Sequence, residues 1–570
     1  GSERLYVESW ASERNVLTVS INQPTTEERI VSFWKELFPS SAYLLGFDDY
    51  VGQLFIPTDV NLTRARRRLR RLKRQTADEI ERKVLDSLEA DLLFQEPSRP
   101  IDRITDAIFA HLVKEGVRVD HMRSLLNQAS CSLAELRKRY KSMKLLPTVR
   151  MLALYRCNGL DSILDTVGKQ TDSAKLRRAV RVAKRGLAQL KRILAVKGFT
   201  DGTFEEAMSI LEEQGQEMGR RNFYGFALRK GYDYLETPDE LERRALRWLR
   251  DEMPLFRNVV RRIARACGCP EDPEAVSEAI QRRRPLKPRQ LVRLTKKVRG
   301  IVQRLVDQTL VGINTQYRTD VVETPPYLSG TIPTGAAQFF NTFSDPFQYF
   351  FITTEKKRDP VKTFADLLDL LVHEEYGHCV HHSNSAHRYA ASPRPIDLIE
   401  TFHVGPTSEG ISFQRELEFL ILVKKLERKK KLTPAERDYV LLMQEMGGLK
   451  VVNRELEFEV MKGRITRFLR VIGDVRINSG KQGLRDFIRW AHNETGLPES
   501  HIYFQLFPAH EGVFPGYATC YAVVGQQIRG IQGKLRTRAQ LMKLNSYASS
   551  LGYPPRSVFI RRLKKFARTL

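Results

Sequence analysis

The sequence predicts a mainly α-helical protein with one small β-sheet. Apolar residues recur at helical spacing in nearly every window between residues 59 and 312, and the pattern returns after Glu416. Between residues 313 and 354, prolines and glycines interrupt the chain, and the run from Phe347 to Thr353 is rich in aromatic and β-branched residues. These observations place helices on both sides of a single β-rich segment.

Two regions follow from this pattern. Residues 3–312 are expected to form a basic, mainly helical N-terminal region, and residues 313–570 a second region that begins with the sheet. Within the first region, residues 3–58 are mixed in character, and short strands and turns are expected around their prolines. A chain of 570 residues with 42% hydrophobic residues is long enough to bury a large core.

A basic amphipathic stretch opens the helical part of the N-terminal region. Its apolar residues fall on one helix face, so the arginines between Arg64 and Arg74 are expected to coat the opposite, solvated face. No aromatic residues interleave with these arginines, as a platform for single-stranded nucleic acid would require. The apolar residues predicted to be buried are Leu62, Leu69, Leu72, Ile80, Val84 and Leu88.

A second amphipathic helix leads into the most informative motif of the chain. Its apolar residues follow the i, i+3, i+4, i+7, i+8 pattern of a helix that is anchored in a core. The helix then runs into His373-Glu-Glu-Tyr-Gly-His378. The apolar residues that carry the pattern are Phe364, Leu367, Leu368, Leu371 and Val372.

Two histidines and a later glutamate supply the ligand types of a hydrolytic zinc site. Zinc binds neutral imidazole nitrogens and carboxylate oxygens, and a catalytic site leaves the fourth position to water, whose pKa falls to about 7. His373, His378 and Glu409 offer such ligands, and Glu374 directly follows the first histidine. Glu374 is therefore the candidate general base.

The two histidines are five residues apart, one more than in the H-E-x-x-H motif of metalloproteases. On an ideal helix this spacing turns the second side chain by roughly 140° from the first. Both can reach one metal only if the helix is overfilled by a residue, as in a π-bulge. Gly377 is expected to accommodate the deformation, because glycine tolerates unusual backbone angles.

Other uses of these histidines stay open. His378, His381 and His382 crowd one stretch, and His378 with His382 forms an ordinary i, i+4 pair. A structural metal, or histidines that are simply satisfied in the core, would also account for the string.

The glutamates that follow favour the catalytic interpretation. Pro406, Thr407 and Ser408 are expected to begin a helix with an N-cap, and the apolar residues after them indicate that this helix is buried. Glu409 and Glu416 are seven residues apart on one helix face, and buried carboxylates need partners. One can bind the metal while the other orients a ligating histidine.

The motifs resemble a known class of enzymes. H-E-x-x-G-H from His373, followed by E-G-x-x-x-x-x-E from Glu409, resembles the gluzincin metallopeptidases. The five-residue spacing is similar to that of the dipeptidyl peptidase III family and of the tyrosine carboxypeptidases that trim tubulin tails. A third segment, from His510 to Gly525, resembles an element of the thermostable, Taq-type carboxypeptidases and of the oligopeptidases. Together the motifs span roughly residues 320–530.

The resemblance implies a two-lobed, mainly helical zinc metallopeptidase with a small β-sheet at the edge of a deep active-site cleft. One Zn²⁺ per chain would be held by His373, His378 and Glu409, with Glu374 as general base. In gluzincins an edge strand just before the metal helix lines the cleft, and Phe347 to Thr353 is the expected counterpart.

Three further side chains match catalytic positions of the resembling families. His510, Tyr517 and Tyr521 correspond to residues that donate hydrogen bonds to the tetrahedral intermediate, a role worth about 3 kcal/mol of the barrier. Packing of the tyrosines in a core is the alternative, and Tyr521 is the stronger candidate. The substrate implied is a peptide or protein tail, cleaved by a carboxypeptidase or oligopeptidase.

The net charge suggests a second class of function. Lysine and arginine number 94 against 68 acidic residues, a formal charge of +26. This charge leaves open a basic helical scaffold that binds nucleic acid or another polyanion and keeps a structural or vestigial metal site. For a peptidase, basic helices beside the cleft would favour acidic substrates.

The sequence also bears on location. No stretch approaches the roughly 18 consecutive apolar residues of a membrane span, and no signal peptide is visible. Six cysteines show neither metal-finger nor disulfide spacing. A cytoplasmic protein in a reducing environment is therefore expected.

Overall fold

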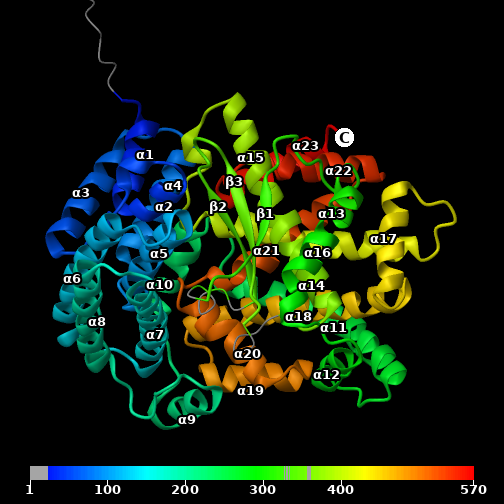
Figure 1. The fold of residues 1–570 in the computed structure, drawn as a ribbon, viewed down its shortest axis with the longest axis horizontal. Coiled ribbons are helices and arrows are strands. Elements are labelled where there is room, and N and C mark those ends of the chain that lie inside the picture. The colour runs from blue at the N-terminus through cyan, green and yellow to red at the C-terminus, as the bar shows by residue number, and fades with distance from the viewer. Residues whose placement is uncertain (1–23, 327, 329–331, 333, 356–360) are drawn as a thin grey trace, which may run out of the picture.

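The computed structural model describes residues 24–570 apart from residues 327, 329–331, 333 and 356–360. It confirms the predicted class, since helices make up most of the chain and one small sheet stands among them (Figure 1). The helices before the sheet are α1 Thr26–Leu37, α2 Pro39–Leu44, η1 Asp48–Tyr50, α3 Asp59–Gln75, α4 Glu79–Leu93, α5 Ser98–Glu115, α6 Val119–Lys141, α7 Pro147–Lys169, α8 Ala174–Leu194, α9 Phe204–Gln214, α10 Arg221–Phe226, η2 Ala227–Gly231, α11 Pro238–Cys267, α12 Pro273–Arg283, η3 Pro288–Gln290 and α13 Leu291–Val306.

The chain after the sheet is again helical. Its helices are α14 Phe364–Leu371, η4 Val372–Cys379, α15 Val380–Ala391, η5 Pro395–Asp397, α16 Val404–Leu426, α17 Pro434–Glu445, α18 Leu449–Asn478, α19 Leu484–Thr495, α20 Glu499–Leu506, η6 Phe507–Glu511, η7 Tyr517–Thr519, α21 Cys520–Gln532, α22 Arg538–Ala548 and α23 Arg556–Ala567. Three of the short elements, η2, η4 and η6, are π-helical.

The sheet has three strands in the order β1, β3, β2: β1 Thr319–Glu323, β2 Gly335–Phe340 and β3 Phe347–Ile352. β3 pairs parallel with β1 and antiparallel with β2. The predicted strand at Phe347 to Thr353 is thus present, but its expected position at the sheet edge is wrong, because it lies in the middle. β1 and β2 are the edge strands, and β2 packs against η4.

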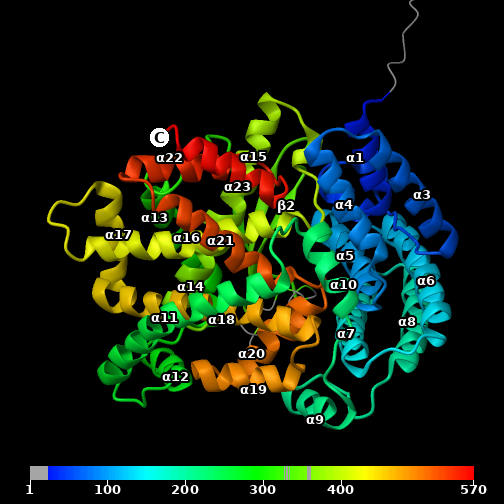
Figure 2. The ribbon, with the colours of Figure 1, turned by 180° about the vertical axis from the view of Figure 1, so that it is seen from behind.

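Apolar side chains from distant parts of the sequence share one core. Phe94, Phe223, Phe402 and Phe514 form a connected aromatic group, in which the rings of Phe402 and Phe514 stack 3.8 Å apart. α11 packs along α18, as both views show (Figures 1 and 2). One core cluster therefore draws side chains from both sides of residue 312. The division into regions 3–312 and 313–570 stays a prediction.

Residues 24–58 differ from the expected short strands, because this described part contains helices and no strand. α1 begins with a capping box, in which the Thr25 and Glu28 side chains bond each other's backbone N–H groups. Pro39 stands in the first turn of α2, where its missing N–H does no harm. Residues 3–23, the rest of the region expected to be mixed, lie outside the described residues.

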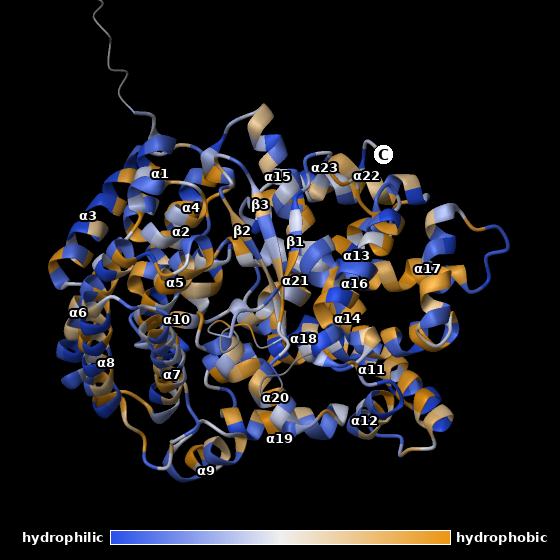
Figure 3. Cartoon of the chain, viewed as in Figure 1, coloured by the Kyte–Doolittle hydropathy of each residue, from blue (hydrophilic) through white to orange (hydrophobic). Residues whose placement is uncertain are grey.

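The basic helices turn their charge outward as predicted. In α3, Leu62, Leu69 and Leu72 are buried, and all six apolar residues predicted for this stretch belong to the core. The outer faces of α3 and α8 are hydrophilic in Figure 3. Within the described residues, no helix is both long and apolar enough to cross a membrane.

Candidate metal centre

The motif from His373 to His378 lies on a helix that changes its winding. α14 continues into the π-helical segment η4, Val372–Cys379, which then returns to α-helix in α15. This overfilled segment confirms the predicted π-bulge. It brings the ring centroids of His373 and His378 to 5.0 Å despite their five-residue spacing.

Gly377 is required by packing rather than by its backbone angles. A Cβ at this position would lie 2.2 Å from Ser412 Oγ and 2.7 Å from Ser412 Cα, on the neighbouring α16. Its φ is not positive, so the expected reason for glycine here is wrong. The missing side chain lets η4 and α16 approach closely, and these two segments carry the three candidate ligands.

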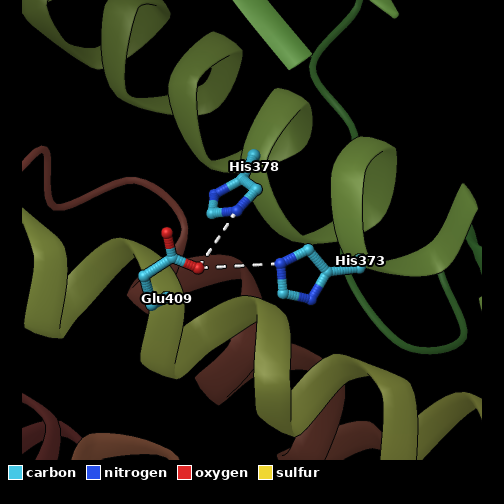
Figure 4. Close-up of side chains that lie close together, drawn as sticks. All are labelled: His373, His378 and Glu409. Carbon is cyan, nitrogen blue, oxygen red and sulfur yellow. Dashed lines mark ion pairs between the residues drawn. The ribbon is translucent and has the colours of Figure 1, made fainter. Parts of the chain in front are cut away.

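The three candidate ligands converge on one point. Glu409 Oε2 is 3.6 Å from His373 Nε2 and 3.5 Å from His378 Nε2 (Figure 4). A tetrahedral zinc ion with bonds of about 2.0–2.1 Å separates its ligand atoms by about 3.4 Å. Glu409 Oε2 is buried and has no hydrogen-bond partner within the described residues. The donor set and its spacing therefore fit Zn²⁺.

The other nitrogen of each imidazole is already occupied. Glu416 Oε1 lies 2.6 Å from His373 Nδ1, and Ser408 Oγ lies 2.9 Å from His378 Nδ1. Glu416 is itself held by Arg467 Nη2, which donates to Oε1 at 2.8 Å. Such partners fix the ring orientation and leave each Nε2 free for a metal. The predicted role of Glu416 in orienting a histidine agrees with this geometry.

Ser408 does not cap the helix as predicted. α16 begins at Val404, with His403 in the capping position and no side-chain hydrogen bond there. Ser408 therefore lies within the helix, on the side that faces His378. The start of the helix was predicted too late because Pro406 was taken to precede it. Proline is tolerated throughout the first turn of a helix, and Pro406 is the third residue of α16.

The charges around the ligands favour a cation. Burial lowers the pKa of His373, but the nearby carboxylates of Glu409 and Glu416 outweigh this effect and raise the pKa to about 10. Burial also raises the pKa of Glu409, yet the two imidazoles hold it well below the ordinary value. A buried carboxylate that stays ionised is stabilised by positive charge, and a divalent ion would supply that charge.

The neighbouring histidines are engaged elsewhere. His381 Nε2 lies 2.8 Å from the Gly552 carbonyl, and His382 bonds Tyr553 and Thr342. Burial lowers the pKa of His381 to about 4 and that of His382 to about 3, so both are neutral core residues. The alternative of a metal held by His378 and His382 is therefore not what the structure shows.

Glu374 faces a large cavity beside the ligands. The cavity, of about 910 Å³, is lined by His373, Glu374 and Tyr521, together with residues of α12, α18, α20 and the start of β2. Glu374 Oε2 accepts a hydrogen bond of 2.9 Å from the Ala337 N–H on β2. A carboxylate at the cavity wall next to the candidate metal ligands is in position to act on a water molecule.

Glu375, the second glutamate of the motif, anchors the π-helical segment. It is fully buried and pairs with Arg299 of α13. Tyr317 donates to the same carboxylate oxygen at 3.0 Å, and Tyr376 donates to the Arg299 carbonyl at 3.1 Å. These bonds fix η4 from the side opposite the ligands.

The segment from His510 to Gly525 also contributes side chains to the candidate metal centre. Tyr521 lines the cavity, with its ring centroid 6.3 Å from that of His373, and His510 Nε2 lies 3.4 Å from the Tyr521 hydroxyl. Burial raises the pKa of Tyr521, so its hydroxyl keeps its proton as a donor. Tyr517 instead donates to Glu409 Oε1 at 2.9 Å, which makes it a support for a ligand.

Sequence reasoning missed Ser408 as a partner of His378, Arg467 as a partner of Glu416, and the Ala337 N–H. The sequence does contain a pattern that could have identified Arg467. Arg464, Arg467 and Arg470 recur every third residue in a mostly apolar part of α18, and buried arginines need partners. No such signal marks Ala337, because every residue except proline carries a backbone N–H.

Comparisons with known proteins inform the fold. Neither protein-family models nor curated proteins match the chain. Two solved structures are similar: a candidate lipoprotein from Colwellia psychrerythraea (TM-score 0.57, 12% identity, 96% of this chain and 100% of that one) and a candidate lipoprotein of unknown function from Shewanella oneidensis (TM-score 0.61, 13% identity, 95% and 100%). At these identities the similarity concerns the fold alone.

Proposed function

We propose that the protein is a zinc-dependent metallopeptidase of the gluzincin type, a carboxypeptidase or oligopeptidase that acts on peptides or protein tails. The convergence of His373, His378 and Glu409 beside a cavity that also exposes Glu374 carries this proposal. Zinc in such a site supplies Lewis acidity and lowers the pKa of water to about 7.

The protein's own groups divide the remaining work. Glu374 would take the proton of the attacking water and pass it to the leaving amine, while the Ala337 N–H holds the carboxylate in place. Tyr521 and His510 would donate to the oxyanion that forms on the scissile carbonyl. Because burial and Arg470 lower the pKa of His510, its ring is neutral and depends on Tyr521 as partner.

An extended substrate has a natural place beside the metal. β2 pairs with β3 on one side only; its Ala337 N–H is taken by Glu374, and its first residue, Gly335, lines the cavity. Free N–H and C=O groups at a strand edge bind a peptide by adding a strand to the sheet. The cavity is lined by seven acidic side chains and four lysines or arginines, so its lining gives no support to the expected preference for acidic substrates.

Metal analysis and a peptide-library digest test the proposal together. Purified protein should contain about one zinc per chain, and His373→Ala, His378→Ala or Glu409→Ala should each remove most of it. His387→Ala is the matched control, since His387 is an exposed histidine on the following helix, α15. Full zinc content in His378→Ala would contradict the ligand assignment.

Glu374→Gln separates the base from the ligands. The variant should keep its zinc and its melting temperature and lose hydrolysis by about 10²- to 10⁴-fold, because a general base is not a ligand. Peptide products are read by mass spectrometry. Unchanged turnover would remove Glu374 from the proposed mechanism.

One observation favours a second candidate function. The arginines of α3 include five that are exposed: Arg64, Arg67, Arg70, Arg71 and Arg74. A surface of this kind suits nucleic acid or another polyanion. Salt-sensitive binding to duplex DNA by a zinc-containing protein that cuts no peptide would favour this scaffold over the peptidase.

The cytoplasm is the proposed location. All six cysteines are unpaired in the structure, and Cys157, Cys379 and Cys520 are buried. Free thiols fit a reducing compartment. Counting free thiols in freshly isolated protein tests the proposed location. Cysteines that are already oxidised would contradict it.

A further inference from the structure

Arg470 occupies an unusual position in the wall of the cavity. Its side chain lies on α18 and is 8% exposed, and its guanidinium carbon is 5.0 Å from the centroid of the Tyr521 ring. Nε donates to the Gln505 carbonyl at 2.9 Å, and Nη2 donates to the Gln505 side chain. Both partners are neutral, and Nη1 makes no hydrogen bond within the described residues.

Three neighbouring cations of this helix differ, because each pairs with a carboxylate. Lys462 pairs with Glu459, Arg464 with Glu252, and Arg467 with Glu416. Among the described residues, no carboxylate lies within 4.0 Å of the Arg470 guanidinium. A buried guanidinium without a counter-ion is unfavourable unless an anion reaches it, and burial indeed lowers its pKa to about 10.

The geometry points to Arg470 as the binding site for the C-terminal carboxylate of a peptide substrate. This inference rests on the proposed peptidase function and names its substrate class. A planar guanidinium matches a carboxylate in shape and charge, and such hydrogen bonds are stronger than neutral ones. The consequence is cleavage close to the C-terminus of the substrate.

The distance from the metal ligands agrees with this role. The Tyr521 ring centroid is 6.3 Å from the His373 ring and 5.0 Å from the Arg470 guanidinium carbon. Since each residue of an extended chain spans about 3.5 Å, the carboxylate and the scissile bond would be separated by one to three residues. The enzyme would therefore release a single residue or a very short peptide.

The direction of β2 gives an independent argument. A peptide paired with this edge in the more stable antiparallel sense runs with its C-terminus toward Gly335, the first residue of the strand. Thr334 and Gly335 line the same cavity as Arg470. The C-terminal end of a peptide bound in this way thus enters the cavity that Arg470 lines.

Direct binding tests the inference without relying on turnover. The probes are a neutral acetylated hexapeptide with a free C-terminal carboxylate, the same peptide as its C-terminal amide, and an amide whose last residue is glutamate. Binding is measured by calorimetry on Glu374→Gln protein, both zinc-loaded and zinc-stripped. The free acid should bind about 10- to 100-fold more tightly than the neutral amide.

Variants assign the preference to Arg470. Arg470→Gln should abolish the preference for the acid, and Arg470→Lys, which keeps the charge without the fork, should retain part of it. Lys462→Gln is the matched control, because Lys462 lines the same cavity but already pairs with Glu459, and it should keep the full preference. Melting temperatures show that each variant is folded.

The outcomes separate this inference from the proposed function. Equal binding of acid and amide, or an acid preference that survives Arg470→Gln, would overturn it. Equally tight binding of the amide that ends in glutamate would assign the site to acidic side chains and also overturn it. A zinc-loaded wild type that cuts no peptide would end the peptidase proposal, whereas internal cleavage of acid and amide alike would end only the inference.

Discussion

Gly377→Ala probes the closest contact at the candidate metal centre. The new Cβ would lie 2.6 Å from Ser412 Cβ and 2.7 Å from Ser412 Cα. Carbon atoms in contact prefer about 3.5–4.0 Å, so η4 and α16 must separate by about 0.8 Å. Backbone atoms cannot rotate away as a side chain can, and the whole displacement falls on the two segments that carry the ligands.

The displacement is large on the scale of metal coordination. Zinc sites tolerate about 0.2 Å in ligand distance, which is a quarter of the required movement. His373 and His378 stand on one segment and Glu409 on the other, so the carboxylate would be drawn away from both imidazoles. We expect the zinc dissociation constant to rise about 100-fold or more, and the free energy of unfolding to fall by about 1–3 kcal/mol.

Zinc competition with a calibrated chelator and thermal melting measure the two effects. Gly530→Ala is the control, since Gly530 lies in α21 with no atom near its added Cβ. It should leave the zinc affinity unchanged and raise the free energy of unfolding by at most about 1 kcal/mol, because alanine favours a helix more than glycine does. Adding Ser412→Gly to Gly377→Ala should recover part of the zinc affinity. A Gly377→Ala protein with zinc affinity within threefold of the wild type would refute the argument that this contact sets the ligand geometry.

Three further predictions concern single side chains. Tyr521→Phe should lower kcat by about 10²-fold with little change in KM or zinc content, which steady-state kinetics and metal analysis check; a lower melting temperature alone would make it a packing residue. Glu416→Gln should weaken zinc binding by about 10- to 100-fold in a chelator titration, and an unchanged affinity would contradict its role in orienting His373. Because folding depresses the pKa of His382 to about 3, the stability contributed by its neutral form is complete above about pH 6.5 and is lost as the pH falls toward 3, by at most about 1.4 kcal/mol per pH unit. His382→Gln should therefore flatten the fall in melting temperature between pH 6.5 and 4.5, and an unaltered slope would contradict the assignment.

The convergence of the candidate ligands could be predicted from the sequence because the spacing that brings them together is local. His373 and His378 share one short motif, and their five-residue spacing already required the overfilled turn that the structure contains. Glu409 and Glu416 could be placed on one face because both lie in a single helix. The partners of the ligands were harder, since hydrogen bonding to a ring nitrogen depends on how two helices cross.

The sheet shows where sequence patterns fail. β3 was predicted, because Phe350, Phe351 and Ile352 favour a strand. β2 was missed, since Gly335, Ala336 and Ala337 have low strand propensity, and the strand forms because β3 pairs with it. The edge position was therefore assigned to the wrong strand, and the N–H group that contacts Glu374 could not be foreseen.

The hydrogen bonds from α15 and α16 to residues 552–554 have a consequence for biosynthesis. His381 is held by the Gly552 carbonyl, His382 by the Tyr553 hydroxyl, and Thr407 of the ligand helix donates to the Pro554 carbonyl at 3.2 Å. Synthesis proceeds from the N-terminus, so residues 552–554 do not yet exist when the His373–His378 motif has just been translated. The hydrogen bonds to these residues cannot have formed at that stage. Nascent chains would therefore carry the ligands without a finished site. If the protein is the proposed peptidase, its activity would arise only after residues 552–554 have been made, and shorter nascent copies would not attack other emerging polypeptides.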